Sequence, residues 1–593
     1  MRGALDTGDI ELGKIYDSKV LNRLPKYLRP VKKWLALGFV GMVMRTLSQL
    51  GIPYVIGQAT DVFIKAGDVN GLNTVALALI GILLVMWAGE YMSTLYLAYA
   101  GQAVLYRMRN EMFNHLHRLS LGFFDHNKVG KLMSRVQNDV GQLQEVITNG
   151  VLNILTSVLT LVGIAAVMII MNPKLALLTL TVVPVLIIVV IIWQAYARRA
   201  FIRVRQAIAI VNDQLQESIS GVRVVQSMSR EEINAERFDD VNKAHLDANI
   251  SAVKLQAMMM PTVQIMTALA YGVLIIFGGA QVLAGTMTVG VLLAFILYVQ
   301  RFFDPVLMLT MQYTEVQRAM ASGSRIFELL DVEPDIKDEP DAIELPVISG
   351  QVSFNELSFS YDPEIEVLHG INLTINPGEM VAIVGRTGAG KSSLMNLVAR
   401  FYEASSGEVT VDGYNVATVT QESLRRQIGI VPQDAFLVSG TIEDNIRYGR
   451  LDATRDEVIQ AAGTAGVHDF IAGLEHGYDT QVGERGGSLS AGQRQLVCLA
   501  RVILADPPIL ILDEATSNVD TNTERIMQES LRRVATDRTL LVIAHRLSTI
   551  TSADRIIVLQ KGDITESGTH RELLAGKGFY YQMFETLSAL EPE

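Results

Sequence analysis

Long runs of hydrophobic residues alternate with polar stretches in the first half of the chain, and this pattern predicts six membrane-spanning helices. The runs lie at about 34–58, 74–98, 147–171, 175–195, 259–283 and 289–311. Each is close to the roughly 20 residues that a helix needs to cross the hydrocarbon core of a bilayer. We therefore expect a helical membrane domain over residues 34–321.

The connections between these runs alternate in length and charge. Three are short and nearly uncharged, at 64–73, 172–174 and 284–288, whereas 99–146 and 196–258 are long and rich in Arg and Lys. The positive-inside rule therefore predicts that the long connections and both chain termini are cytoplasmic. Hydrophobic residues at helical spacing continue into the second long connection, so we expect the helices to extend well beyond the bilayer. The residues that show this spacing are Leu215, Ile219, Val222 and Val225.

Several polar residues fall within or next to the predicted spans: Arg45, Glu90, Asn149, Asn153, Gln264 and Arg301. Ionisable and polar side chains are costly in lipid and often mark a transport pathway. The alternative is that they pair between neighbouring helices or lie near the membrane interfaces. No pattern among them identifies a transported compound.

Residues 1–33 form an N-terminal segment with its own character. Residues 1–17 contain no apolar core of a cleavable signal peptide. Between Lys19 and Lys33, hydrophobic residues alternate with Arg and Lys, which favours a basic amphipathic helix lying on an anionic membrane surface. A solvated loop is the alternative.

The composition changes again after the last span. Acidic residues and Pro334, Pro340 and Pro346 predict a linker over residues 322–349. From Val352 onward, strand and helix patterns alternate, so residues 350–593 are expected to form an α/β domain.

Composition adds three restrictions. The mean hydropathy of +0.29 fits a chain that lies partly in lipid, and the net charge of −12 does not favour nucleic acid as a partner. Cys498 is the single cysteine, which excludes an intramolecular disulfide. Its hydrophobic neighbours Leu496, Val497 and Leu499 predict a buried structural thiol.

A phosphate-binding motif lies near the start of the α/β domain. Gly385-Arg386-Thr387-Gly388-Ala389-Gly390-Lys391-Ser392 fits G-x-x-x-x-G-K-[ST], with the apolar run 380–384 before it and a helical pattern from Ser393 after it. In that context the glycines allow backbone N–H groups to surround phosphates at a helix N-terminus. We expect Lys391 to contact the β- and γ-phosphates and Ser392 to bind Mg²⁺.

A second nucleotide motif follows well downstream. The apolar run 509–512 ends in Asp513 and Glu514. Asp513 is expected on the magnesium side of the phosphates, and Glu514 as the general base that polarises the attacking water.

Further motifs appear in the order found in ATP-binding cassette (ABC) proteins, which the chain resembles. Residues 489–493, Leu-Ser-Ala-Gly-Gln, stand where that family has its L-S-G-G-Q signature. The resemblance implies that Tyr361 stacks on adenine and that Gln433, the Q-loop residue, serves magnesium binding and catalysis. It also implies a D-loop at Asp520 and a catalytic switch histidine at His545. In this family the signature contacts the γ-phosphate of the nucleotide that a partner domain holds. The residues implied in that last contact are Ser490, Ala491, Gly492 and Gln493.

Six spans followed by this domain resemble an exporter-type half-transporter of the multidrug and lipid exporter family. The implied fold is a membrane helix bundle followed by an α/β P-loop ATPase domain of ABC type. The implied ligands are ATP and Mg²⁺, and the implied partner is a second half-transporter in the cytoplasmic membrane. Residues 122–135 and 217–232 resemble the two cytoplasmic coupling loops.

Ala491 departs from the family pattern, because the signature usually has glycine there. The extra methyl group can crowd the γ-phosphate or be tolerated in ordinary helical geometry. An intact Glu514 beside an altered signature fits the catalytic chain of a heterodimer, and a homodimer stays open. The expected activity is ATP-driven export of a hydrophobic or amphipathic compound, such as a drug or lipid. The alternatives are an ATP-gated or regulatory protein that does not pump, and a siderophore-type importer subunit of exporter build.

Overall fold

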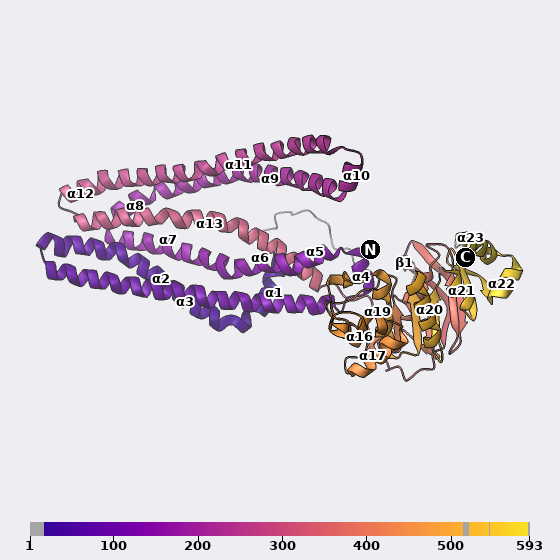
Figure 1. Ribbon diagram of the computed structural model, residues 1–593. Helices are drawn as coiled ribbons and strands as arrows, with labels where there is room; N and C mark the ends of the chain where they lie inside the picture. The colour runs from indigo at the N-terminus through magenta and orange to yellow at the C-terminus, as the bar shows by residue number, and fades with distance from the viewer. Residues whose placement is uncertain (1–16, 514–520, 545, 591–593) are drawn as a thin grey trace. The chain divides into compact units, whose positions relative to one another are not determined.

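The computed structural model describes residues 17–513, 521–544 and 546–590, which divide into two compact units (Figure 1). The helical unit contains residues 17–116 and 130–331, and the α/β unit contains residues 117–129 and 332–590. Residues 117–129 lie between membrane-length helices in the sequence but belong to the α/β unit.

Within the described part of the chain, six helical spans are long and apolar enough to cross a membrane. They are Ser18–Ile64, Val69–Leu116, Val129–Met171, Pro173–Ser220, Glu231–Leu283 and Val289–Leu330. All six predicted spans are confirmed. Each has between 42 and 53 residues, which at about 1.5 Å per residue gives roughly 60–80 Å, about twice the thickness of the hydrocarbon core. The predicted extension of the helices beyond the bilayer is therefore also confirmed.

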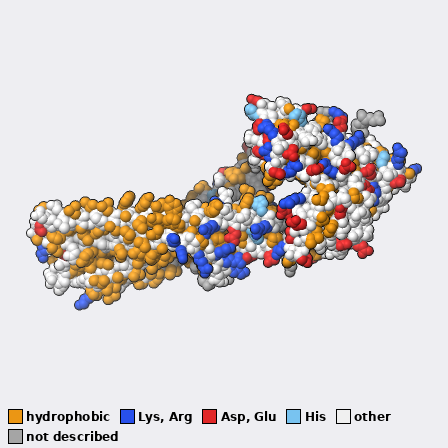
Figure 2. Space-filling view, turned by 90° about the horizontal axis from the view of Figure 1, so that it is seen from below, with side chains coloured by type: hydrophobic (Ala, Val, Ile, Leu, Met, Phe, Trp, Pro, Cys, Tyr) orange, Lys and Arg blue, Asp and Glu red, His pale blue; other side chains and the backbone are white. Residues whose placement is uncertain are grey.

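The spans consist of α-helices joined in places by short π-helical turns at 59–64, 135–139, 146–150 and 274–278. Figure 2 shows hydrophobic side chains covering much of the surface of these helices, as expected for a surface that faces lipid. The helices are α1 (Ser18–Leu28), α2 (Lys32–Gln58), α3 (Val69–Leu116), α5 (Val129–Ser134), α6 (Val140–Glu145), α7 (Val151–Met171), α8 (Pro173–Leu180), α9 (Val182–Ser220), α10 (Val222–Ser227), α11 (Glu231–Val273), α12 (Gly279–Leu283) and α13 (Val289–Leu330).

The basic amphipathic segment is helical, as α1, but its apolar face packs on protein. Val20, Leu24 and Tyr27 are buried, and the rings of Tyr27 and Phe327 of α13 have centroids 6.3 Å apart. Tyr27 also donates a hydrogen bond of 2.9 Å to Glu111 of α3. The apolar face of α1 is thus covered by α3 and α13, and the predicted location of this helix on an anionic membrane surface stays a prediction.

The polar residues of the spans mostly follow the pairing alternative. Arg45 of α2 forms an ion pair with Glu90 of α3, with 2.5 Å between Nε and Oε2. Arg301 of α13 donates a 2.8 Å hydrogen bond to the carbonyl oxygen of Gln49. Asn149 donates to Glu145 of its own helical span at 2.7 Å. These contacts satisfy the side chains between or within helices.

The acidic linker begins later than predicted, because α13 continues to Leu330. Residues 332–349 then pack on the α/β unit, with Ile336, Leu345 and Ile348 buried. Their anchor is Arg400, whose guanidinium donates to the carbonyl oxygens of Val419 at 2.8 Å and Lys337 at 3.1 Å.

Two sheets form the α/β unit, and their strand orders are β2-β1-β4-β5 and β12-β11-β3-β10-β9-β6 (Figure 1). In the second sheet β6, β9, β10, β3 and β11 are parallel, and β12 is antiparallel. The strands are β1 (Val352–Asp362), β2 (Ile365–Ile375), β3 (Met380–Val384), β4 (Ser406–Val411), β5 (Tyr414–Asn415), β6 (Ile428–Val431), β7 (Gly440–Thr441), β8 (Gln481–Val482), β9 (Ile509–Asp513), β10 (Thr539–Ile543), β11 (Arg555–Gln560) and β12 (Asp563–Gly568).

The parallel strands are continuous apolar runs because both faces of their sheet are covered, one by helices that include α19 and the other by α14 and strands β1 and β2. Residues 381–384 of β3 and 509–512 of β9 are all buried. Cys498 of α19 is buried in the same core, and burial raises the pKa of its thiol, so the predicted structural thiol is confirmed. The helices are α4 (Leu121–His126), α14 (Lys391–Val398), α15 (Gln421–Arg426), α16 (Ile442–Arg447), α17 (Arg455–Thr464), α18 (His468–Ala472), α19 (Ala491–Ala505), α20 (Thr521–Val534), α21 (Leu547–Ser552), α22 (His570–Gly576) and α23 (Phe579–Leu590).

Candidate nucleotide-binding site

The glycine-rich loop connects the end of β3 at Val384 to the start of α14 at Lys391. Gly388 and Gly390 have φ angles of 80° and 101°, which side chains rarely adopt. A Cβ atom at Gly390 would also lie 2.7 Å from Leu368 Cδ2, so this position has no room for a larger residue. The strand, loop and helix context that the motif requires is confirmed, and the loop precedes a helix N-terminus that favours anions.

Lys391, Ser392 and Ser393 form the first turn of α14. Lys391 is buried, and its ammonium group donates to the carbonyl oxygens of Gly385 at 2.7 Å and Arg386 at 3.2 Å. The Ser392 side chain is exposed, whereas Ser393 is buried. The loop therefore places a cation and an accessible hydroxyl group at the same helix end.

The ends of the parallel strands bring further predicted residues to this edge of the sheet. Asp513 ends β9, and Gln433 lies two residues beyond the end of the adjacent strand β6. Asp513 is in register with Ile543 of β10, which is in register with Ile383 of β3, just before the glycine-rich loop. Glu514, Asp520 and His545 lie outside the described residues.

These groups fit a magnesium nucleoside triphosphate. The left-handed glycines and Lys391 suit phosphate oxygens, and the Ser392 hydroxyl and Asp513 carboxylate are the oxygen ligands that Mg²⁺ prefers. Ligands in open parallel sheets bind at the carboxyl ends of the strands, where these residues lie.

Tyr361 of β1 was predicted to stack on adenine, and its ring is 43% exposed. Its hydroxyl group lies 3.0 Å from the hydroxyl of Ser393 in α14. Tyr361 thus contacts the helix that follows the glycine-rich loop directly, and part of its ring remains accessible.

The signature residues form the N-terminus of α19. The Ser490 hydroxyl accepts a hydrogen bond from the Gln493 N–H at 3.2 Å, and the Gln493 side chain accepts one from the Ser490 N–H at 2.9 Å. This capping box satisfies the first turn of the helix. Ala491 is the first residue of α19, so its methyl group occupies ordinary helical geometry, and Gly492 beside it is buried.

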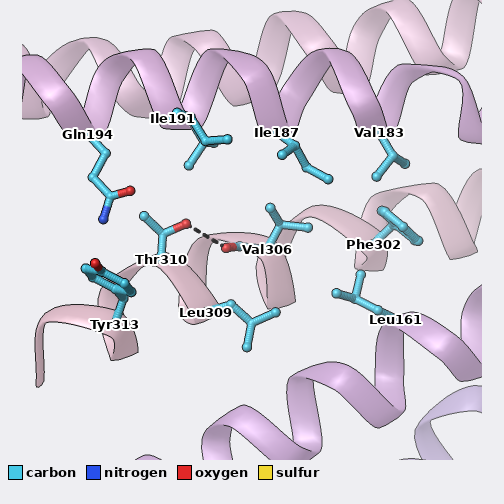
Figure 3. Close-up of a pocket in the computed structure, with 11 residues that line it drawn as sticks. Leu161, Val183, Ile187, Ile191, Gln194, Phe302, Val306, Leu309, Thr310 and Tyr313 are labelled. Carbon is cyan, nitrogen blue, oxygen red and sulfur yellow. Dashed lines mark hydrogen bonds between the residues drawn. The ribbon is translucent and has the colours of Figure 1, made fainter. Parts of the chain in front are cut away.

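A separate cavity of about 330 Å³ lies in the helical unit between α7, α9 and α13 (Figure 3). Its walls are apolar, with Ile187 and Ile191 on α9 and Phe302 on α13. Gln194 and Tyr313 lie together at one end of the cavity, as Figure 3 shows. The cavity is therefore a mostly hydrophobic pocket with a polar end.

Two residues next to the nucleotide motifs were not predicted from the sequence. Tyr402, shortly after α14, donates a hydrogen bond to Asp125 of α4. Burial and this hydrogen bond raise the pKa of the Tyr402 hydroxyl, which therefore remains a donor at neutral pH. The sequence signal was limited to an aromatic pair after the helix and the resemblance of residues 122–135 to a coupling loop.

Comparison with known proteins agrees with this geometry. Residues 35–306 match the family model of the ABC transporter transmembrane region, and residues 368–517 match the ABC transporter family model. A fatty acid ABC transporter ATP-binding/permease protein of Mycobacterium bovis is 41% identical over 86% of this chain and 80% of that protein. An ATP-dependent lipid A-core flippase of Syntrophus aciditrophicus is 37% identical over 95% of this chain and 94% of that protein.

A solved structure is also similar over almost the whole chain. It is a bacterial Atm1-family ABC exporter with ATP bound, with 31% sequence identity and a TM-score of 0.76, and the match covers 97% of this chain and 100% of that chain. The chain therefore belongs to the ABC transporter family, as an exporter-type half-transporter that joins one multi-pass membrane domain to one ATP-binding domain.

Proposed function

We propose that two copies of this chain, or this chain and a related half-transporter, export a hydrophobic or amphipathic compound by hydrolysing ATP. The observation that carries this proposal is the glycine-rich loop with its buried Lys391, fused in one chain to six membrane-length spans. Relatives named as a fatty acid transporter and a lipid A-core flippase support a lipid-like substrate class.

Each residue of the candidate site has its own role in binding or hydrolysing the nucleotide. The N–H groups of residues 385–390 and the Lys391 ammonium bind and orient the phosphates, and Tyr361 stacks on the base. Ser392, Asp513 and Gln433 would hold Mg²⁺, which would supply charge neutralisation at the transferred phosphate. Glu514 accepts a proton from the attacking water, and His545 orients the water and the γ-phosphate.

A second chain completes each site. The capped N-terminus of α19, with Ser490, Ala491, Gly492 and Gln493, contacts the γ-phosphate held by the partner chain, and Asp520 lies at the same junction. ATP bound between the chains closes the ATP-binding domains and favours the outward-facing state, and hydrolysis reverses this. The two states need to differ in affinity for the ligands by only a few kcal/mol.

The apolar cavity between α7, α9 and α13 receives the hydrophobic part of the substrate, while Gln194 and Tyr313 contact a polar group. Both termini lie on the cytoplasmic side of the cytoplasmic membrane in this proposal, which the Arg- and Lys-rich long connections support.

The test is the ATPase activity of the purified chain alone in lipid nanodiscs, beside the Glu514→Gln variant. Turnover above about 1 s⁻¹ that falls at least a hundredfold in the variant would support an active homodimer. Well-folded protein that binds ATP but does not turn it over would point to a missing partner chain. Turnover unchanged in Glu514→Gln would contradict the assigned general base.

A further inference from the structure

A group of three aromatic rings lies between the expected adenine position and a cytoplasmic loop of the membrane domain. Tyr361 contacts Phe359 edge-on, with centroids 4.7 Å apart, and Tyr402 contacts Tyr361 edge-on, with centroids 5.0 Å and planes 87° apart. Tyr402 also contacts Phe359 at 5.6 Å. The position of one ring therefore depends on the positions of the other two.

The group is fixed at both ends by hydrogen bonds. At one end the Tyr361 hydroxyl meets Ser393 of α14, in the turn that begins with Lys391. At the other end the Tyr402 hydroxyl donates to Asp125 of α4. The backbone of α4 is also close, because a Cβ atom at Gly122 would lie 3.3 Å from the Tyr402 ring.

The contact between Tyr402 and Asp125 matters because of where α4 lies in the chain. Residues 117–129 connect α3 to α5, and both of these helices belong to membrane-length spans. The same residues pack as part of the α/β unit. Tyr402 thus contacts a segment that is covalently continuous with two membrane-length spans and that packs on the ATP-binding domain.

We propose that Tyr402 is a positioning residue that transmits adenine stacking on Tyr361 to α4 through Asp125. A base that stacks on the exposed face of Tyr361 restricts that ring, the edge-on contact shifts Tyr402, and the hydrogen bond to Asp125 moves α4. The base, in addition to the phosphates, then sets the state of this loop. The inference rests on the proposed binding of ATP at residues 385–392.

The test compares full-length wild-type protein with Tyr402→Phe in lipid nanodiscs. Tyr402→Phe keeps the ring contacts and removes only the hydrogen bond to Asp125. Amide hydrogen exchange of residues 117–129 is measured without nucleotide, with saturating ATP, and with saturating UTP, all with EDTA to prevent turnover. UTP supplies the same triphosphate with a smaller ring, so a difference between ATP and UTP reports the base.

In the wild type we expect ATP to change exchange in 117–129 about two- to tenfold more than UTP does, a range set by the usual strength of an aromatic pair. In Tyr402→Phe the two nucleotides should have equal effects, while ATP affinity stays within about twofold of wild type. Tyr414→Phe, at an exposed tyrosine of β5, is the matched control and should behave as wild type.

A difference between ATP and UTP that persists at full size in Tyr402→Phe would overturn the inference. So would a loss of ATP affinity in that variant, because it would indicate a binding or folding role. Wild-type protein that binds and hydrolyses ATP while Tyr402→Phe has no effect on the loop would leave the proposed function standing and remove this inference alone. Absence of ATP binding by the wild type would overturn both.

Discussion

At the scale of single residues, Arg400 shows how one side chain holds the connection between the two halves of the chain. It is only 2% exposed, although it is charged. Besides its bonds to Val419 and Lys337, its guanidinium meets the carboxylates of Asp338 and Glu403 at 3.4 and 3.2 Å. A buried cation with this many acceptors orders residues 332–349 against the α/β unit, although their acidic, proline-containing sequence is typical of a flexible linker.

We predict that Arg400→Met destabilises the ATP-binding domain by about 2–4 kcal/mol, because buried carbonyl oxygens lose their charged donor. For a domain of this size the unfolding midpoint should fall by roughly 4–16 °C in scanning calorimetry. The matched control is Arg426→Met, which removes an exposed ion pair with Glu422 and should change stability by less than about 1 kcal/mol. Equal midpoints for the two variants would contradict the anchoring role of Arg400.

The residues of the nucleotide site differ in how well the sequence predicted them. The glycine-rich loop, Lys391 and Asp513 were predicted from local motifs. A short motif determines the conformation of its own backbone, and the strand next to it determines where the motif lies in the sheet. The contact between Tyr402 and Asp125 was not predicted, because these residues are 277 positions apart in the chain. Only the fold brings them together, because the resemblance of residues 122–135 to a coupling loop does not identify Tyr402 as the partner of Asp125.

At the scale of elements, α1 shows that an amphipathic pattern predicts a helix but not what covers it. Its exposed basic residues suit a membrane surface, yet its apolar residues fit a groove between α3 and α13. Arg23 of α1 pairs with Asp331 at 2.7 Å and lies over the Phe327 ring. The decisive feature is Gly323 of α13, since a Cβ atom there would lie 2.7 Å from a methyl group of the buried Val20. Hydrophobic periodicity describes one helix at a time, so it does not predict that Val20 of α1 fits against Gly323 of α13.

We predict that Gly323→Ala loosens α1. Forcing a methyl group into this contact costs about 1–3 kcal/mol, so amide exchange of residues 18–28 should become about 5- to 100-fold faster if it proceeds by local opening. In the double variant Val20→Ala/Gly323→Ala the added methyl group has space, so exchange should be no faster than in Val20→Ala alone. Gly51→Ala is the control, because a Cβ atom at Gly51 meets nothing within 4 Å. Additive effects of the two substitutions would contradict the packing of Val20 on Gly323.

At the scale of the whole molecule, the sequence predicted the two-part architecture because both parts rest on strong local signals. Apolar runs of bilayer length fix the membrane helices, and the glycine-rich loop fixes the start of the ATP-binding core. The packing of residues 117–129 with the α/β unit was indicated only by the resemblance of residues 122–135 to a coupling loop, and the extension of α13 to Leu330 was not predicted. Both features depend on contacts between segments far apart in the chain, for which hydropathy and spacing give no signal.

The proposed dimer has composite ATP sites, each with the glycine-rich loop of one chain and the signature of the other. Within one chain the side chains of Ser490 and Gln493 each accept a hydrogen bond from the backbone N–H of the other residue in the capping box. Lys391→Ala should therefore inactivate one half of a site and Ser490→Arg the other half. A dimer that contains one chain of each variant has one intact site and one site with both defects.

We predict that such mixed dimers, isolated with two different affinity tags, recover ATPase activity that neither variant shows alone. The expected rate is about half that of the wild-type dimer if the two sites act independently, since one intact site remains.

The control is a mixed dimer of wild-type and Lys391→Ala chains, which also contains a single intact site. If this control is active and the Lys391→Ala/Ser490→Arg dimer is not, the signature must act on the loop of its own chain, and the composite site is wrong. If both mixed dimers are inactive, hydrolysis requires both sites together. Equal ATPase activity in the two mixed dimers would indicate that the Ser490 turn contacts the nucleotide bound to the partner chain. Only that arrangement leaves one intact site in each mixed dimer.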